Sequence, residues 1–67
     1  MSAYLHHLVI EGDGSIREGI QVRLKPLAKS KWFGVRAYKT LDSARRAAVR
    51  WRNQQLRAAG RRDLIPK

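Results

Sequence analysis

The order of apolar and polar positions predicts three β-strands followed by one helix. Residues 4–10 are apolar, aromatic or histidine, and residues 11–15 (EGDGS) have the composition of a tight turn between strands. Residues 20–25 then alternate, as is typical of a strand with one buried face. Its core face has Ile20, Val22 and Leu24, and its opposite face has Gln21, Arg23 and Lys25. Pro26 ends this strand, and Gly19 is interpreted as a bulge or a delayed start of pairing.

A third strand is predicted over residues 31–39 (KWFGVRAYK), after a loop that carries Lys29 and Lys31. Alternation places Phe33, Val35 and Ala37 toward the core, and Trp32, Gly34, Arg36 and Tyr38 on the opposite face. The predicted outward face of the sheet is therefore both basic and aromatic.

The helix is predicted from Thr40, the expected N-cap, to about residue 59, with Gly60 as its end. One side of this helix is rich in alanine, which lets its axis lie close to the sheet, and Trp51 adds bulk. That side has Leu41, Ala44, Ala47, Ala48, Trp51, Ala58 and Ala59, and the opposite side has Arg46, Arg50, Asn53 and Arg57. Val49 and Leu56 are expected to lie to one side.

The predicted fold class is α+β, with a three-stranded antiparallel sheet in the order β-β-β-α and one C-terminal helix on one face. The 67 residues form a single domain over residues 1–60 and a basic C-terminal tail over residues 61–67. Within that tail, Leu64 and Ile65 either stay free or tuck under the sheet. There is no cysteine, so neither a disulfide nor a thiolate metal site is expected to add stability, and a reducing, intracellular location is compatible.

In the first strand, Tyr4, Leu8 and Ile10 are assigned to the core and His6 to its rim, which leaves Leu5 and Val9 available for a homodimer contact. His6 and His7 point to opposite faces of a strand and cannot chelate one metal together, so no metal or other cofactor is expected. There is no paired carboxylate, no nucleophile beside a histidine and no phosphate-binding glycine loop, so no catalytic residues are assigned and the chain is not expected to be an enzyme.

Charge is unevenly distributed along the chain. The formal net charge is +10, with −2 over residues 1–20 and +12 over residues 21–67. Such a field attracts polyanions, which makes nucleic acid the leading class of partner. Residues 3–10 are too short to span a bilayer and no signal peptide is evident, so the expected location is the cytoplasm, on the nucleoid if the protein binds DNA.

Two surfaces are candidates for nucleic-acid binding. On the sheet, cations suit phosphates or guanine, and aromatic rings offer flat contact surface. The predicted binding residues there and in the adjoining loop are Arg23, Lys25, Lys29, Lys31, Trp32, Arg36, Tyr38 and Lys39, with Gln21 as a secondary candidate. On the helix, Arg46, Arg50 and Arg57 form a stripe that either follows a phosphate backbone or is solvated surface.

Residues 32–51 (WFGVRAYKTLDSARRAAVRW) resemble the last strand and helix of small sheet-plus-helix DNA-binding domains. Such domains occur in plant ethylene-response-type transcription factors and, more distantly, as the arm-binding domains of phage tyrosine integrases. The shared features are the aromatic residues and glycine of residues 32–34, the strand-ending Thr40 and Leu41, and the helix alanines. This resemblance implies a sheet inserted in the major groove, with Arg23, Lys25, Trp32 and Arg36 as groove contacts.

The sequence therefore predicts a non-enzymatic protein that binds duplex DNA, of phage or bacterial origin, with a role in transcription regulation or DNA architecture. One alternative is RNA or single-strand binding by the same face, with Trp32 and Tyr38 stacking on bases. Another alternative is a small phage-type regulator that docks on an acidic surface of a host protein, where the first strand adds to a partner's sheet.

Overall fold

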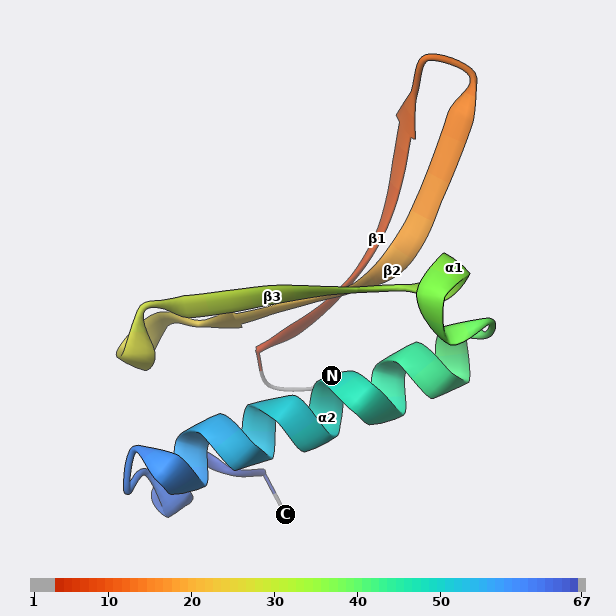
Figure 1. The fold of residues 1–67 in the computed structure, drawn as a ribbon. Helices are drawn as coiled ribbons and strands as arrows, with labels where there is room; N and C mark the ends of the chain where they lie inside the picture. The colour runs from red at the N-terminus through yellow and green to blue at the C-terminus, as the bar shows by residue number, and fades with distance from the viewer. Residues whose placement is uncertain (1–3, 67) are drawn as a thin grey trace.

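A computed structural model of the chain describes residues 4–66 as a three-stranded antiparallel sheet with a long helix on one face (Figure 1). Strand β1 (Leu5–Gly12) pairs with β2 (Ser15–Leu24), and β2 pairs with β3 (Lys29–Gly34). A short helix α1 (Val35–Tyr38) and the long helix α2 (Leu41–Ala58) follow. The 3-10 turns η1 (Lys25–Leu27) and η2 (Arg62–Leu64) lie in the β2–β3 connection and near the C-terminus. The predicted β-β-β-α arrangement and the α+β class are confirmed.

The turn between β1 and β2 is formed by Asp13 and Gly14, whose φ angles are 42° and 78°. Positive φ at both central residues belongs to the two-residue hairpin turn that matches the twist of the strands. Pairing is continuous on either side of Gly19, which faces Leu8 on β1 and Gly34 on β3. Gly19 is therefore not a bulge, and β2 begins earlier than the alternation alone indicated.

The faces of β1 are the reverse of the prediction. The register places Leu5 opposite Val22, so Leu5 is buried in the core, with 8% of its surface exposed. Leu8 and Ile10 lie on the other face and are 37% and 49% exposed. The prediction was wrong because every residue from 4 to 10 is apolar, aromatic or histidine, so composition did not distinguish the two faces.

Strand β3 is shorter than predicted and lies earlier in the chain. It starts at Lys29 and ends at Gly34, after which Val35–Tyr38 form α1. Arg36 and Tyr38 therefore do not lie on the sheet, and Ala37 is exposed instead of buried. The chain has to turn here because α2 crosses beneath the sheet, and Lys39 completes the turn with a φ of 72°.

The core lies between α2 and one face of the sheet. Its buried apolar residues are Leu5, Ile20, Val22, Leu24, Phe33, Ala44, Ala47, Ala48 and Leu56. The predicted alanine contacts of the helix are thus largely present, although Ala58 is exposed and Leu56, expected at the side, is fully buried. Arg52 also lies in this interface with 5% of its surface exposed, and this burial lowers the pKa of its guanidinium.

Both ends of α2 are well defined. The Thr40 hydroxyl oxygen accepts a hydrogen bond from the Ser43 N–H at 3.1 Å, which confirms the predicted N-cap. Beyond the helix, Gly60 has a φ of 72°, as expected of a residue that ends a helix. Leu64 and Ile65 are half-buried against the core, which is the tucked arrangement of the C-terminal segment.

The far half of the β1–β2 hairpin projects beyond α2 (Figure 1). We call residues 8–18 the hairpin arm; apart from Glu18, which is half-buried, these residues are exposed on both faces. The arm accounts for much of the elongated shape, with extents of 42 × 21 × 20 Å.

Candidate nucleic-acid interface

The sheet face opposite α2, called the outer face here, carries the side chains best placed to meet a large partner. Cross-strand pairing arranges it in rows, because residues directly opposite one another share a face. The rows are His6–Gln21–Trp32, Leu8–Gly19–Gly34, Ile10–Arg17 and Arg23–Ser30. The long helix α2 covers the other face of the sheet (Figure 1).

Trp32 is held against the sheet by a pair of glycines. A Cβ atom built on Gly19 would lie 2.8 Å from Trp32 Cζ2, and one built on Gly34 would lie 3.0 Å from Trp32 Nε1. The indole therefore occupies the space that side chains at these paired positions would fill. Trp32 is half-buried, so part of its side chain is available for contact. The two glycines therefore favour one seat for the indole on the sheet before any partner binds.

Gln21 and Arg23 extend this surface along β2. Gln21 is half-buried beside Trp32, and Arg23 is exposed opposite Ser30. Residues two apart on a strand are about 6.8 Å apart, which is close to two base-pair steps of about 3.4 Å each.

Two further cations lie at opposite ends of the β2–β3 ribbon. Lys25 is in η1, where β2 ends, and Arg36 is in α1, which follows β3 (Figure 1). Both are exposed, as is Lys39 between α1 and α2. These three predicted residues lie in turns and short helices, outside the strands that form the outer face.

The remaining predicted binding residues lie on the helix side. Lys29 Nζ donates a hydrogen bond to Gln55 Oε1 at 2.9 Å, and Lys31 Nζ is 5.3 Å from the centroid of the Phe33 ring. The Tyr38 ring is 5.8 Å from that of Phe33, centroid to centroid. Lys29, Lys31 and Tyr38 therefore do not lie on the outer face with Trp32. Lys29 and Lys31 were predicted in a loop but lie on β3, because the strand begins earlier than predicted. Tyr38 was predicted on the sheet but lies in α1, because the strand ends earlier.

The arginine stripe on α2 lies on the opposite side of the molecule from the outer face. Arg46 Nε is 3.0 Å from Asp42 Oδ2, in an exposed pair one helical turn apart. Arg50 and Arg57 are exposed on the same side of the helix. Because the core separates the two surfaces, one groove of a duplex cannot contact both of them.

Three polar residues of the outer face were missed in the sequence, namely His6, Arg17 and Ser30. Only the strand register reveals them, and the signal for it was the Asp13–Gly14 turn, which fixes every pair on both sides. His7 lies on the helix side, where its Nε2 is 2.8 Å from Glu18 Oε2.

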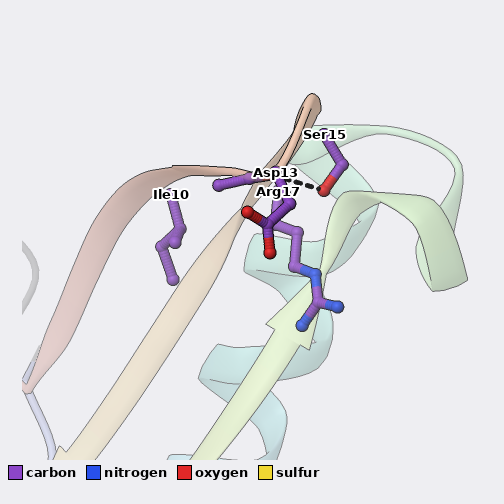
Figure 2. Close-up of a pocket in the computed structure, with 5 residues that line it drawn as sticks. Ile10, Asp13, Ser15 and Arg17 are labelled. Atoms are coloured by element: carbon purple, nitrogen blue, oxygen red, sulfur yellow. Dashed lines mark hydrogen bonds between the residues drawn. The ribbon is translucent and has the colours of Figure 1, made fainter.

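Metal binding and pockets are two further aspects of the residues that the structure describes. Residues 4–66 contain no group of three His, Asp or Glu side chains able to hold a metal ion. Figure 2 shows a shallow pocket at the end of the hairpin arm, lined by Ile10, Gly12, Asp13, Ser15 and Arg17. The Ser15 hydroxyl there donates to the Gly12 carbonyl at 3.0 Å, which is a turn contact. Over the same residues, no helix combines the length and apolar character needed to cross a bilayer.

Comparison with known proteins found no matching protein-family model, curated protein or solved structure. The resemblance to sheet-plus-helix DNA-binding domains therefore stays a prediction.

Proposed function

We propose that this protein binds duplex DNA without catalysing a reaction, and that the β2–β3 part of the outer face enters a groove. The observation that carries this proposal is Trp32, seated on Gly19 and Gly34 beside Gln21 and Arg23 on a sheet face that no helix covers. An aromatic ring, an amide and a guanidinium on one accessible ribbon are the chemical groups that read base edges.

Each side chain has a distinct role in this mode of binding. Arg23 donates to the guanine edge or to a phosphate, and Gln21 pairs with adenine. Trp32 makes apolar contact with the thymine methyl group or the sugar. Lys25 and Arg36, at the two ends of the ribbon, and Lys39 hold phosphates and fix the orientation of the protein.

The charge distribution supports the same orientation. Residues 21–67 carry +12, whereas the first twenty residues, which include the hairpin arm, carry −2. A polyanion is attracted to the body of the domain and repelled by the arm, so the arm points away from the duplex. A regulatory or architectural factor of a phage or bacterium, located in the cytoplasm on the nucleoid, fits this description.

RNA or single-stranded nucleic acid is the second candidate, because the accessible part of the Trp32 ring can stack on an unpaired base. Single-strand binding usually uses several aromatic side chains on one surface. Tyr38 packs toward Phe33, so the outer face has one aromatic residue, Trp32, among the residues described. This arrangement favours duplex DNA.

An amide-shift titration with a random duplex, with single strands of the same sequence as competitor, tests this proposal. We expect shifts concentrated in β2 and β3, and an affinity that falls about tenfold in Arg23→Ala, as for the loss of a good base or phosphate contact. Arg50→Ala removes the same charge from the solvent side of α2 and serves as the matched control, with a change of less than about twofold. Shifts confined to α2, or equal losses in the two variants, would contradict the assignment to the outer face. Stronger binding of the single strand would favour the second candidate.

A further inference from the structure

Strand β1 is an edge of the three-stranded sheet, and no backbone hydrogen bond between the described residues uses its outward groups. The Tyr4 carbonyl accepts from the Arg23 N–H at 2.9 Å, so Tyr4 and Arg23 form a hydrogen-bonded pair. Such pairs alternate along an antiparallel ladder. The N–H and C=O groups of His7, Val9 and Glu11 therefore point away from β2, along the open edge of the three-stranded sheet.

The two edges of this sheet differ in how they are protected. The β3 edge carries Lys29 and Lys31, and lysines are a common protection against edge-to-edge pairing. The β1 sequence, LHHLVIEG, has no lysine, no proline and no bulge in its register. Of the two edges, β1 is therefore the one free to accept another strand.

The hairpin arm also exposes three large apolar side chains to solvent. Leu8, Val9 and Ile10 are 37%, 54% and 49% exposed, and they lie on both faces of β1. A two-stranded hairpin is marginally stable in water, whereas three or more strands with a hydrophobic face are stable. The arm carries three acidic residues and one basic residue, Arg17, so its charge disfavours a nucleic-acid partner.

We propose that β1 pairs antiparallel with β1 of a second copy of this chain, centred on Val9. In this register the sequence is complementary to itself. Leu8 lies opposite Ile10 of the second copy on the outer face, and His7 lies opposite Glu11 of the second copy on the helix side. The Val9 residues of the two copies face each other at the two-fold axis, where each provides one N–H and one C=O.

The neighbouring register is less favourable. Centring the pair on Leu8 also uses the free backbone groups, but it places Glu11 of one copy opposite Leu5 of the other. Leu5 is buried in the core. In that register the Glu11 carboxylate would lose hydration without gaining a partner, because His7 lies opposite Val9. In the register centred on Val9, Glu11 lies opposite His7, and the residue opposite Leu5 is Asp13, which belongs to the turn beyond β1. The register centred on Val9 is therefore preferred.

Pairing of this kind produces a continuous six-stranded sheet with two outer faces related by a two-fold axis. The row Leu8–Gly19–Gly34, over which the Trp32 indole lies, continues into Ile10 of the second copy. If the outer face binds DNA as proposed above, the dimer presents two equivalent ribbons and prefers inverted repeats. That consequence rests on the proposed function, whereas the strand pairing does not.

Sedimentation equilibrium without nucleic acid tests the pairing. We expect a mass of twice 7.7 kDa for the unmodified chain at micromolar concentration and 7.7 kDa for Val9→Pro, which removes an N–H that β2 does not use. Ile16→Pro is the matched control, because its N–H points to the other side of the arm, past the end of β3. That variant should stay dimeric. A monomeric unmodified chain, or proline variants that behave alike, would overturn the proposal.

Cysteine cross-linking then tests the register, since the chain has no cysteine of its own. Leu8 and Ile10 of the two copies would form non-hydrogen-bonded pairs with Cα atoms about 4.5 Å apart, within the range that a disulfide spans. Under mild oxidation, the double variant Leu8→Cys with Ile10→Cys should form a covalent dimer. Leu8→Cys alone should not, and its cross-linking would place the axis on Leu8 and refute the register.

Since neither measurement contains DNA, loss of dimerisation and loss of DNA binding are separate results. A dimer that fails to bind duplex DNA leaves the strand pairing intact and refutes the proposed function. A monomer that binds duplex DNA through the outer face refutes the strand pairing and leaves the proposed function intact.

Discussion

Trp32 lies directly over Gly19: its Cζ2 atom is 2.8 Å from where a Cβ of that glycine would be. The same Cβ would also clash with the carbonyl oxygen of Phe33 and lie 2.9 Å from Gly34 Cα. Backbone atoms of a paired strand cannot move aside in the way a side chain can. Position 19 therefore requires a glycine for steric reasons. The requirement at position 34 is weaker, because the nearest neighbour there is the Trp32 indole.

Gly19→Ala should lower the free energy of unfolding by about 1–3 kcal/mol, the usual cost of inserting a methyl group into a closely packed site. Gly34→Ala should cost less, because the indole can shift, but it should disturb the Trp32 surface. Urea unfolding curves of the two variants, together with duplex affinity, check this difference. Equal losses of stability would show that the close approach at Gly19 is not the determining contact.

Duplex affinity should depend strongly on salt. With three to four phosphates held by lysine and arginine, the association constant is expected to fall roughly 40- to 150-fold between about 50 and 200 mM salt. Fluorescence anisotropy across this range gives the number of released counterions from the slope. An affinity independent of salt would exclude the phosphate contacts assigned to Lys25, Arg36 and Lys39.

Leu56 should be one of the most sensitive core positions on α2. It is fully buried, so Leu56→Ala is expected to cost about 2–5 kcal/mol, which is a large fraction of the stability of a domain this small. Val49→Ala is the comparison, because Val49 is on the same helix but only half-buried. Thermal unfolding followed by circular dichroism should show a much larger loss for Leu56→Ala, and similar losses would mean that the helix packs differently.

Removing the lysines of β3 should open the second edge of the sheet. The double variant Lys29→Val with Lys31→Val is expected to form assemblies larger than a dimer, because edge strands without charges pair with one another. Arg50→Val with Arg57→Val removes the same charge from exposed helix positions and should leave the size unchanged. Light scattering at matched concentrations distinguishes the two. Growth in both variants would indicate that net charge, and not edge protection, controls solubility.

The sequence was most informative where two independent signals agreed. Alternation in β2 predicted the core positions of Ile20, Val22 and Leu24, and these three side chains are buried. The Asp-Gly turn and the Thr40 cap were also predicted correctly, because each depends on a local backbone requirement that few residues satisfy.

Features that depend on register or on tertiary contact could not be predicted in this way. The two faces of β1 were exchanged because its residues do not alternate in polarity, and the end of β3 was missed because α1 continues the same pattern of residue types. Arg52 is a further example: it is buried, although a hydrophobic pattern assigns every arginine of a helix to the exposed side. Of the predicted site, Trp32, Arg23 and Gln21 remain together on one face, whereas Lys29, Lys31 and Tyr38 do not.

The order of elements also has a consequence for synthesis of the chain. All three strands precede α2, so the sheet leaves the ribosome before the helix that covers it. During that interval the apolar side chains of Ile20, Val22, Leu24 and Phe33 are open to water. Lys29 and Lys31 lie on this same face, so the nascent sheet carries two positive charges beside its exposed apolar side chains. These two lysines can thus keep the growing chain from aggregating until α2 arrives.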